Sequence, residues 1–203
     1  MKYLLILLVC MIGLQGQAQK TTVKYTDTLT LPKLAFDEKG ELVITPSATS
    51  SSHDFDYLVG KWTLKHTKLR SRLVNCKDWD SFETVVEDFN GLAGLGNFDI
   101  GQATFEGKPW EGRTIRIFNP QTRLWSLFWV ASDRGVMDPP VVGSFENNIG
   151  LFFCKDVYKG KPVIVVFRWD KRNPEVPVWS QAFSDDNGKT WEWNWYNFSY
   201  RKE

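Results

Sequence analysis

Two aromatic-rich stretches decide the fold: DFDYLVGKW at residues 54–62 and WEWNWYNFSYR at residues 191–201. Strands use aromatic side chains readily, because the rings cover a pleated, half-buried surface well. The first stretch ends in a Gly-x-Trp, from Gly60 to Trp62, and the second ends in Arg201. Together they predict an antiparallel β-barrel closed on itself, and such barrels usually hold a small molecule.

The bulk composition indicates one globular domain. The chain has 203 residues, of which 42% are apolar and 24% are charged, so it is long enough to bury a core. Only the aromatic content is unusual, with ten Trp and fourteen Phe.

The N-terminus has the pattern of a secretory signal peptide, residues 1–18. Lys2 supplies a positive start, and residues 4–14 form an apolar run that is too short to span a bilayer. Small residues up to Ala18 predict cleavage after that position, so the mature chain begins at Gln19 and is periplasmic or secreted. No other stretch is apolar enough to predict a transmembrane segment.

The charge balance argues against two classes of partner. Residues 1–18 contain one basic residue, Lys2, and no acidic one, so the mature chain keeps 24 basic and 24 acidic residues. A net charge of zero gives no general attraction to nucleic acid or to an anionic membrane surface.

The three cysteines leave two questions open. Cys10 lies in the signal-peptide run, where a lipid anchor is the alternative to plain secretion. Cys76 and Cys154 could pair in an oxidising compartment or act as small buried hydrophobes, and their spacing does not decide between these.

The chain divides into an N-terminal extension and linker, residues 19–52, and a β domain, residues 53–203. In the extension, two short apolar runs flank DEKG at residues 37–40, which predicts a hairpin turn. Residues 47–52, SATSSS, have the composition of a small, polar linker.

Turn signals within the β domain indicate closely connected strands. They stand at residues 119–122, 159–162 and 185–188. With no helical crossover between them, the pattern predicts an up-and-down antiparallel barrel of about ten strands, with a two-sheet sandwich as the alternative. A short helical turn through Leu58, capped by Ser52 or Asp54, precedes the first strand.

The block from His53 to Arg201 resembles an uncharacterised bacterial family of lipocalin-like barrels, a domain of unknown function. The matching pieces, in order, are residues 54–62, 94–97, 138–143, 167–169 and 191–195. The resemblance implies the calycin fold shared by lipocalins, fatty-acid-binding proteins and nitrobindins, but little about chemistry. It also implies that Trp62 packs at the closed end of the barrel under Arg201, as a cation–π contact.

The first strand places one histidine toward the interior. Because side chains alternate along a strand, His66 shares the face of Trp62. An inward histidine could orient a ligand, act as a general base or bind a metal. The alternative is a core histidine whose ring nitrogens are satisfied by a neighbouring polar group.

Two arginines sit between apolar neighbours within predicted strands. Arg116 and Arg168 would need a carboxylate if buried, and Glu192 with Asn194 on the last strand could supply one. We therefore expect His66, Arg116, Arg168, Glu192 and Asn194 to form a polar, ligand-binding cluster in an aromatic pocket. Alternatively, the two arginines face solvent on the outer pleat.

Other motifs are interpreted as structural. Residues 184–191, SDDNGKTW, match the Asp-box pattern, which shapes a hairpin. The glycine-rich residues 91–96 predict a bulge or a tight turn rather than a phosphate site. No residues have metal-ligand spacing, and the two histidines, His53 and His66, are poorly placed for haem, so the sequence predicts no metal and no cofactor.

The leading hypothesis is an exported lipocalin-like protein that binds a small, mostly apolar or aromatic ligand. Three alternatives stay open: an isomerase, hydratase or hydrolase on the same barrel; a carbohydrate-binding envelope protein that uses tryptophans such as Trp79 and Trp110; and an envelope protein that binds other proteins through residues 19–52.

Overall fold

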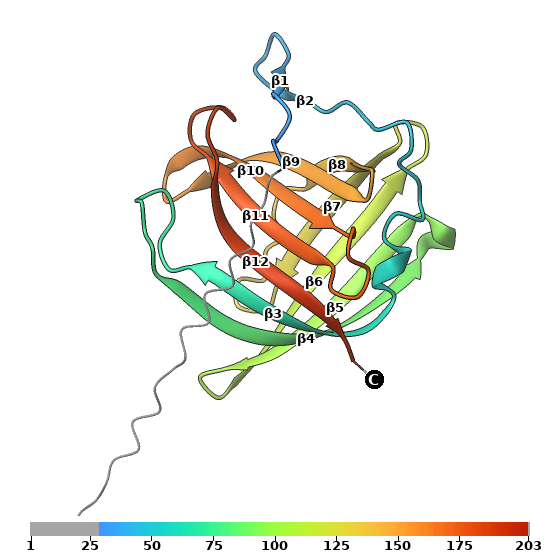
Figure 1. The fold of residues 1–203 in the computed structure, drawn as a ribbon, viewed down its shortest axis with the longest axis vertical. Helices are drawn as coiled ribbons and strands as arrows, with labels where there is room; N and C mark the ends of the chain where they lie inside the picture. The colour runs from blue at the N-terminus through green and yellow to red at the C-terminus, as the bar shows by residue number, and fades with distance from the viewer. Residues whose placement is uncertain (1–28, 203) are drawn as a thin grey trace, which may run out of the picture. The chain divides into compact units, whose positions relative to one another are not determined.

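A closed barrel of ten antiparallel strands, preceded by a small hairpin, makes up the computed structural model, which describes residues 29–202 (Figure 1). The predicted signal peptide, its cleavage site after Ala18 and residues 19–28 of the extension lie outside the described residues.

Each barrel strand pairs with the strand that follows it in the sequence, and β12 returns to pair with β3. The predicted up-and-down barrel is therefore confirmed, and the two-sheet alternative is wrong. Closure leaves no unpaired sheet edge on a wall rich in aromatic residues. The strands are β3 (Gly60–Leu69), β4 (Trp79–Gly91), β5 (Gly96–Phe105), β6 (Lys108–Asn119), β7 (Leu124–Ala131), β8 (Val141–Glu146), β9 (Ile149–Tyr158), β10 (Lys161–Asp170), β11 (Val178–Ser184) and β12 (Glu192–Arg201).

The predicted turns all connect neighbouring strands, and the Asp-box is the clearest of them. Asp186 accepts hydrogen bonds from the Thr190 hydroxyl at 2.6 Å and from the backbone amides of Lys189 and Thr190 at 3.0 and 2.9 Å. These bonds lower the pKa of Asp186 to about 2, and the bond from the Thr190 hydroxyl is the largest cause. Gly188 has a φ of +81°, which favours glycine. The glycine-rich residues 91–96 form the tight turn between β4 and β5, through the 3-10 helix η2 (Leu92–Gly94).

The closed end of the barrel is built around Trp62. The guanidinium carbon of Arg201 lies 4.0 Å from the centroid of the Trp62 ring, which confirms the predicted cation–π contact. Arg201 also donates to the backbone oxygens of Val59 and Tyr57, at 2.6 and 3.2 Å. Gly60 permits this approach, because it has a φ of +122° and a Cβ there would lie 2.7 Å from Arg201 Nη1. The Gly-x-Trp motif therefore works as one unit with Arg201.

The segment before β3 forms the floor of the barrel. Its 3-10 helix η1 (Asp56–Leu58) confirms the predicted helical turn, but no side chain caps it. Asp54 instead accepts a hydrogen bond from Ser50 Oγ at 2.7 Å and one from Trp125 Nε1 at 3.1 Å. Phe55, which is fully buried, packs edge-on against Trp125 and two other core rings. The floor is thus held by aromatic packing and by the Asp54 carboxylate.

The described part of the extension contains the predicted hairpin, β1 (Ala35–Phe36) paired with β2 (Leu42–Val43). Residues 47–52, predicted as a small, polar linker, contact the barrel. Ser50 is 1% exposed, and Arg123 Nη2 donates to the backbone oxygens of Ala48 and Ser50, each at 2.5 Å. Small, polar residues here allow close packing on the barrel rather than flexibility.

Replacing Trp62 with alanine should lower the free energy of unfolding by about 3–5 kcal/mol, because the side chain is 2% exposed and its loss leaves a cavity under Arg201. Urea denaturation of the variant and the wild type would measure the difference. Trp79→Ala is the control, since that ring is 41% exposed, and it should cost less than about 1 kcal/mol. Equal midpoints for Trp62→Ala and the wild type would contradict the role assigned to Trp62.

Candidate functional site

The barrel encloses a cavity of about 980 Å³. Alternate residues of each strand face it, as the two-residue period of a strand requires. On β3 these are Trp62, Leu64, His66 and Lys68, which follow one another from the floor toward the opposite end.

An aromatic belt lines much of this cavity. Neighbouring rings along it lie with centroids 5.0–6.3 Å apart, the range of favourable edge and offset contacts. Seven strands each contribute one ring to the belt, which consists of Trp129, Trp110, Phe105, Phe82, Trp195, Trp179 and Phe167. It gives a ligand a continuous apolar surface with flat faces.

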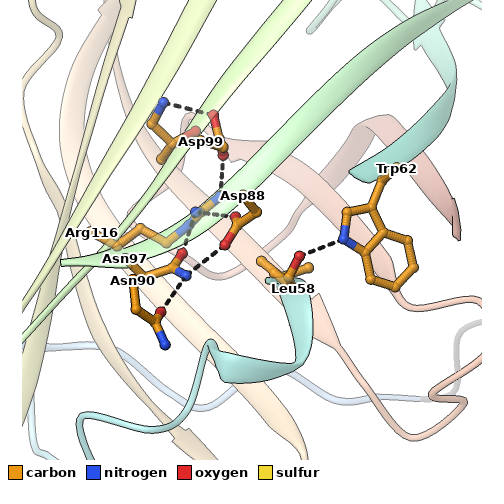
Figure 2. Close-up of polar contacts among 8 residues, drawn as sticks. Leu58, Trp62, Asp88, Asn90, Asn97, Asp99 and Arg116 are labelled. Atoms are coloured by element: carbon orange, nitrogen blue, oxygen red, sulfur yellow. Dashed lines mark hydrogen bonds and ion pairs between the residues drawn. The ribbon is translucent and has the colours of Figure 1, made fainter. Parts of the chain in front are cut away.

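A buried ionic cluster around Arg116 lies at the floor end of the cavity (Figure 2). Arg116 Nη1 donates to Asp88 Oδ2 at 2.9 Å and to Asn97 Oδ1 at 2.6 Å, while Nη2 is bonded to Asp99. Asp88 also accepts from Asn97 Nδ2 at 2.6 Å. Arg116 is 4% exposed, so these partners replace the water that its charge has lost.

Burial changes the protonation equilibria of this cluster. It raises the pKa of Asp88 to about 6, with Asp99 adding to the shift and Arg116 opposing it. Burial also raises the pKa of Tyr57, so its hydroxyl stays protonated. That hydroxyl is buried and makes no hydrogen bond to any described residue, although Tyr57 lines the cavity. The floor therefore places a hydroxyl that has no partner among the described residues beside a cluster whose charges are paired.

His66 lines the cavity, as predicted, but its ring nitrogens are both engaged. Trp195 Nε1 donates to Nδ1 at 3.2 Å, and because an indole N–H can only donate, Nε2 carries the proton and donates to Thr84 Oγ1 at 2.9 Å. The ring also stacks on Phe82 at 4.5 Å. Burial, with the nearby Lys68 charge, lowers the pKa of His66 to about 4. At neutral pH it is an uncharged wall residue, which matches the alternative of a satisfied core histidine.

Arg116 also lines the cavity, but the other three predicted site residues, Arg168, Glu192 and Asn194, do not. Arg168 sits on the opposite face of β10 from Phe167 and Trp169, and its guanidinium carbon lies 4.3 Å from the Trp193 ring centroid. Arg168 is nevertheless fully buried. It therefore neither joins a cluster in the cavity nor faces solvent, which were the two predicted alternatives.

Glu192 and Asn194 are engaged elsewhere on β12. Glu192 Oε1 accepts from the backbone amide of Leu73 at 2.7 Å and so fixes the loop between β3 and β4. Asn194 is fully buried, accepts from Gln181 Nε2 at 2.8 Å and donates to the Glu192 backbone oxygen. It stands beside a register shift between β11 and β12, where an amide can satisfy irregular backbone.

The expected convergence on one polar end is therefore wrong, although His66 and Arg116 do share the cavity. In the β3–β4 pairing, His66 is opposite Phe82, whereas the Asp88 that binds Arg116 is opposite Gly60. Six residues of a strand span roughly 20 Å, so the two groups lie at different levels of the barrel.

Sequence reasoning missed the carboxylates that bind Arg116. Thr84, Val86 and Asp88 alternate along the inward face of β4, and Asp99 faces inward on β5. A lone aspartate on such a face is a charge that needs a partner, and that signal was present in the sequence. Glu192 was predicted as the carboxylate partner instead, because the order of strands along the sequence does not show which side chains meet inside the barrel.

Cys76 and Cys154 are not bonded to each other. Cys76 lies in the loop between β3 and β4, while Cys154 faces the cavity from β9, where burial raises its thiol pKa to about 12. Cys154 therefore behaves as a small wall residue rather than as a nucleophile.

Fold and cavity together define a closed, ten-stranded antiparallel β-barrel with an aromatic-lined interior cavity. No model of a known protein family matches the chain, and no curated protein matches it. Among residues 29–202, no helix is long and apolar enough to cross a membrane.

Removal of the Arg116 charge should be costly. Arg116→Met leaves Asp88 and Asp99 buried without their cation, so we expect a loss of about 3–5 kcal/mol in the free energy of unfolding. Arg113→Met on the same strand is the matched control, because the exposed Arg113–Glu111 pair should contribute less than about 1 kcal/mol. Chemical denaturation would measure both, and similar losses would contradict the importance of burial.

His66 should make the folded protein sensitive to acid. Its folded pKa of about 4 lies below the ordinary 6.5, so stability is fully present above pH 6.5 and is lost as pH falls toward 4. The difference corresponds to about 3 kcal/mol. His66→Gln keeps a donor and an acceptor but cannot titrate, so denaturation at several pH values should show wild type losing that much relative to the variant.

The raised pKa of Asp88 changes stability with pH in the opposite direction, but both the wild type and His66→Gln contain Asp88, so its contribution cancels in the comparison. His53→Gln, which removes the exposed histidine, should keep the acid sensitivity of the wild type. A stability difference between wild type and His66→Gln that does not change with pH would show that His66 is not held in its neutral form.

Proposed function

We propose that this protein is an exported lipocalin-like binding protein that holds a small, mostly apolar or aromatic ligand inside its barrel. The observation that carries the proposal is the cavity of about 980 Å³ with an aromatic belt in its wall. Small-molecule sites of roughly 300–1,000 Å³ are typically apolar with a few placed polar groups, and this cavity has that composition.

The rings that face the cavity support an apolar or aromatic ligand in particular. A filled barrel core would bring opposite walls into contact, whereas here the belt residues face open space across a large interior. Flat faces such as Trp179 and Trp195, which meet edge to face at 5.4 Å, are suited to ring stacking and to alkyl packing.

The alternatives have less support. Of the residues expected to carry acid–base chemistry, both His66 nitrogens are engaged and Arg116 is bonded to its own cluster. A sugar-binding surface would need exposed tryptophans in one row, but Trp110 lines the cavity, whereas Trp79 pairs with Tyr196 outside it.

Export is part of the proposal, and it rests on the sequence of residues 1–18. N-terminal sequencing of the mature protein from the bacterial envelope should return Gln19 as the first residue. Recovery of the chain from the cytoplasm with Met1 intact would contradict export.

A cavity-filling variant tests the binding site. Val86→Trp adds a ring on the inward face of β4, whereas Val85→Trp adds the same ring on the exposed outer face of the same strand. The neutral probe N-phenyl-1-naphthylamine, which fluoresces in apolar surroundings, should bind the wild type and Val85→Trp alike. Its affinity for Val86→Trp should fall roughly tenfold, because part of its space is taken.

Native mass spectrometry of protein purified from its own envelope should in addition show a bound molecule. If the probe does not bind the wild type, or if it binds all three proteins equally, the barrel interior is not the binding site.

A further inference from the structure

Two cations face the cavity at the end opposite Trp62 and have no carboxylate partner among the described residues. Lys68 is the last inward residue of β3, and Arg72 lies in the loop that comes after it. A ligand-binding role for this pair rests on the proposed function, because the two cations belong to the same cavity.

The outward cations of β3, and Arg70 just after it, show how unusual that is. Lys61 lies 3.9 Å from Glu87, Lys65 lies 3.7 Å from Glu83, and Arg70 lies 2.7 Å from Asp80. Each pairs across to β4 in solvent, where a partner is needed least. Lys68 and Arg72, which are partly buried, form no ion pair with any described residue, although burial makes pairing more important.

The edge of the Arg72 guanidinium that could bind two oxygens at once is not hydrogen-bonded. Its Nε and Nη2 atoms are buried and make no hydrogen bond to any described residue. Arg172 shows what this edge can do, because its own Nε and Nη2 bind the two oxygens of Asp170 at 2.9 and 2.6 Å. An arginine fork of this kind matches the geometry of a carboxylate or a phosphate.

Aromatic rings hold Arg72 beside the cavity. Its guanidinium carbon lies 5.2 Å from the Phe183 ring and 5.8 Å from the rings of Tyr158 and Trp195. Ring faces attract a cation but cannot accept two parallel N–H bonds, so a rotation of the guanidinium into the cavity toward an oxyanion would gain those bonds. Glu192 fixes the neighbouring Leu73 amide and so positions this loop.

Lys68 meets Arg72 at the same ring. Its Nζ lies 4.1 Å from the Trp195 centroid, on which Arg72 also lies. Burial, with the Arg72 charge, lowers the pKa of Lys68 to about 8. Two like charges beside one ring repel each other, and an anion placed between them would relieve that repulsion.

The carboxylates that face the pair are occupied by other groups. Asp80 of β4 is bonded to Arg70, Asp133 after β7 accepts from Trp110 Nε1 at 3.3 Å, and Glu192 of β12 accepts from Leu73. These carboxylates reduce the local positive potential, but none of them forms an ion pair with Lys68 or Arg72. Tyr158 of β9 contacts Arg72 through its ring.

We propose that Lys68 and Arg72 bind the oxyanion of an amphiphilic organic acid whose apolar or aromatic body lies along the aromatic belt. The ligand is then an anion with one charged head, oriented with that head away from Trp62. Trp195 connects the two parts of the site, since it belongs to the belt and carries both cations on its faces.

A matched pair of fluorescent probes isolates the charge. 1-Anilinonaphthalene-8-sulfonate and N-phenyl-1-naphthylamine share one ring body and differ by the sulfonate. The wild type should bind the sulfonate at least roughly tenfold more tightly, and Lys68→Gln and Arg72→Gln should each lose about tenfold for the sulfonate. Neither variant should change the affinity for the neutral probe by more than about twofold, which shows that the barrel is intact.

The controls are Lys65→Gln and Arg70→Gln, which remove the outward cations on either side of Lys68 and should leave both affinities unchanged. Displacement of the neutral probe by decanoate, decyl phosphate, decanol and decylamine then identifies the head group. Decanoate and decyl phosphate should compete better than decanol, decylamine should compete worst, and the better of the two anions distinguishes a carboxylate from a phosphate ester.

Titration of Lys68 gives an independent readout. Sulfonate affinity in the wild type should fall as pH rises through 8 toward 10, because Lys68 loses its charge while the probe keeps its own. Lys68→Arg should keep the affinity and remove most of this pH dependence.

Equal affinity of the wild type for both probes, or equal losses for both probes in Lys68→Gln and Arg72→Gln, would overturn the anion site while leaving the binding function in place. If the wild type binds neither probe, the proposed function fails together with this inference.

Discussion

The closure of β12 onto β3 is the constraint on which the rest of the structure depends, and the contact between Arg201 and Trp62 fastens it. One guanidinium stacks on the indole and also bonds the backbone oxygens that lead into β3. Because Trp62 Nε1 donates to the Leu58 oxygen, the same ring holds the floor segment in place. Without this closure the inward faces of ten strands would open, and the cavity would have no walls.

Buried charges occur in two different arrangements in the barrel, one paired with carboxylates and one not. At the floor, Arg116 is enclosed by Asp88, Asp99 and Asn97, which accept three hydrogen bonds from its two terminal nitrogens. At the other end, Lys68 and Arg72 rest on aromatic rings and form no ion pair with a described residue. The first arrangement stabilises a fold, since its charges are already neutralised. The second leaves charge available to a ligand.

Much of the fold is determined by local sequence, because turns and strand periodicity are short-range properties. The Asp-box, the glycine-rich turn, the hairpin of the extension and the strand count were all predicted from residues a few positions apart. The packing of residues 47–52 could not be predicted for the same reason. A run of small, polar residues has the same composition whether it is free or packed, and only the contact with Arg123 distinguishes the two states.

The candidate site was likewise predictable only where it depends on short-range sequence. Alternation along β3 was enough to place His66 on the inward face of the barrel, because the direction of a side chain within a strand depends only on its parity from Trp62. Which groups meet was decided by tertiary structure alone. Arg116 meets Asp88 and Asp99, and Arg168 points away from the cavity. The physical reason is that strand register and barrel closure determine cross-barrel contacts, and neither is encoded in any single stretch of sequence.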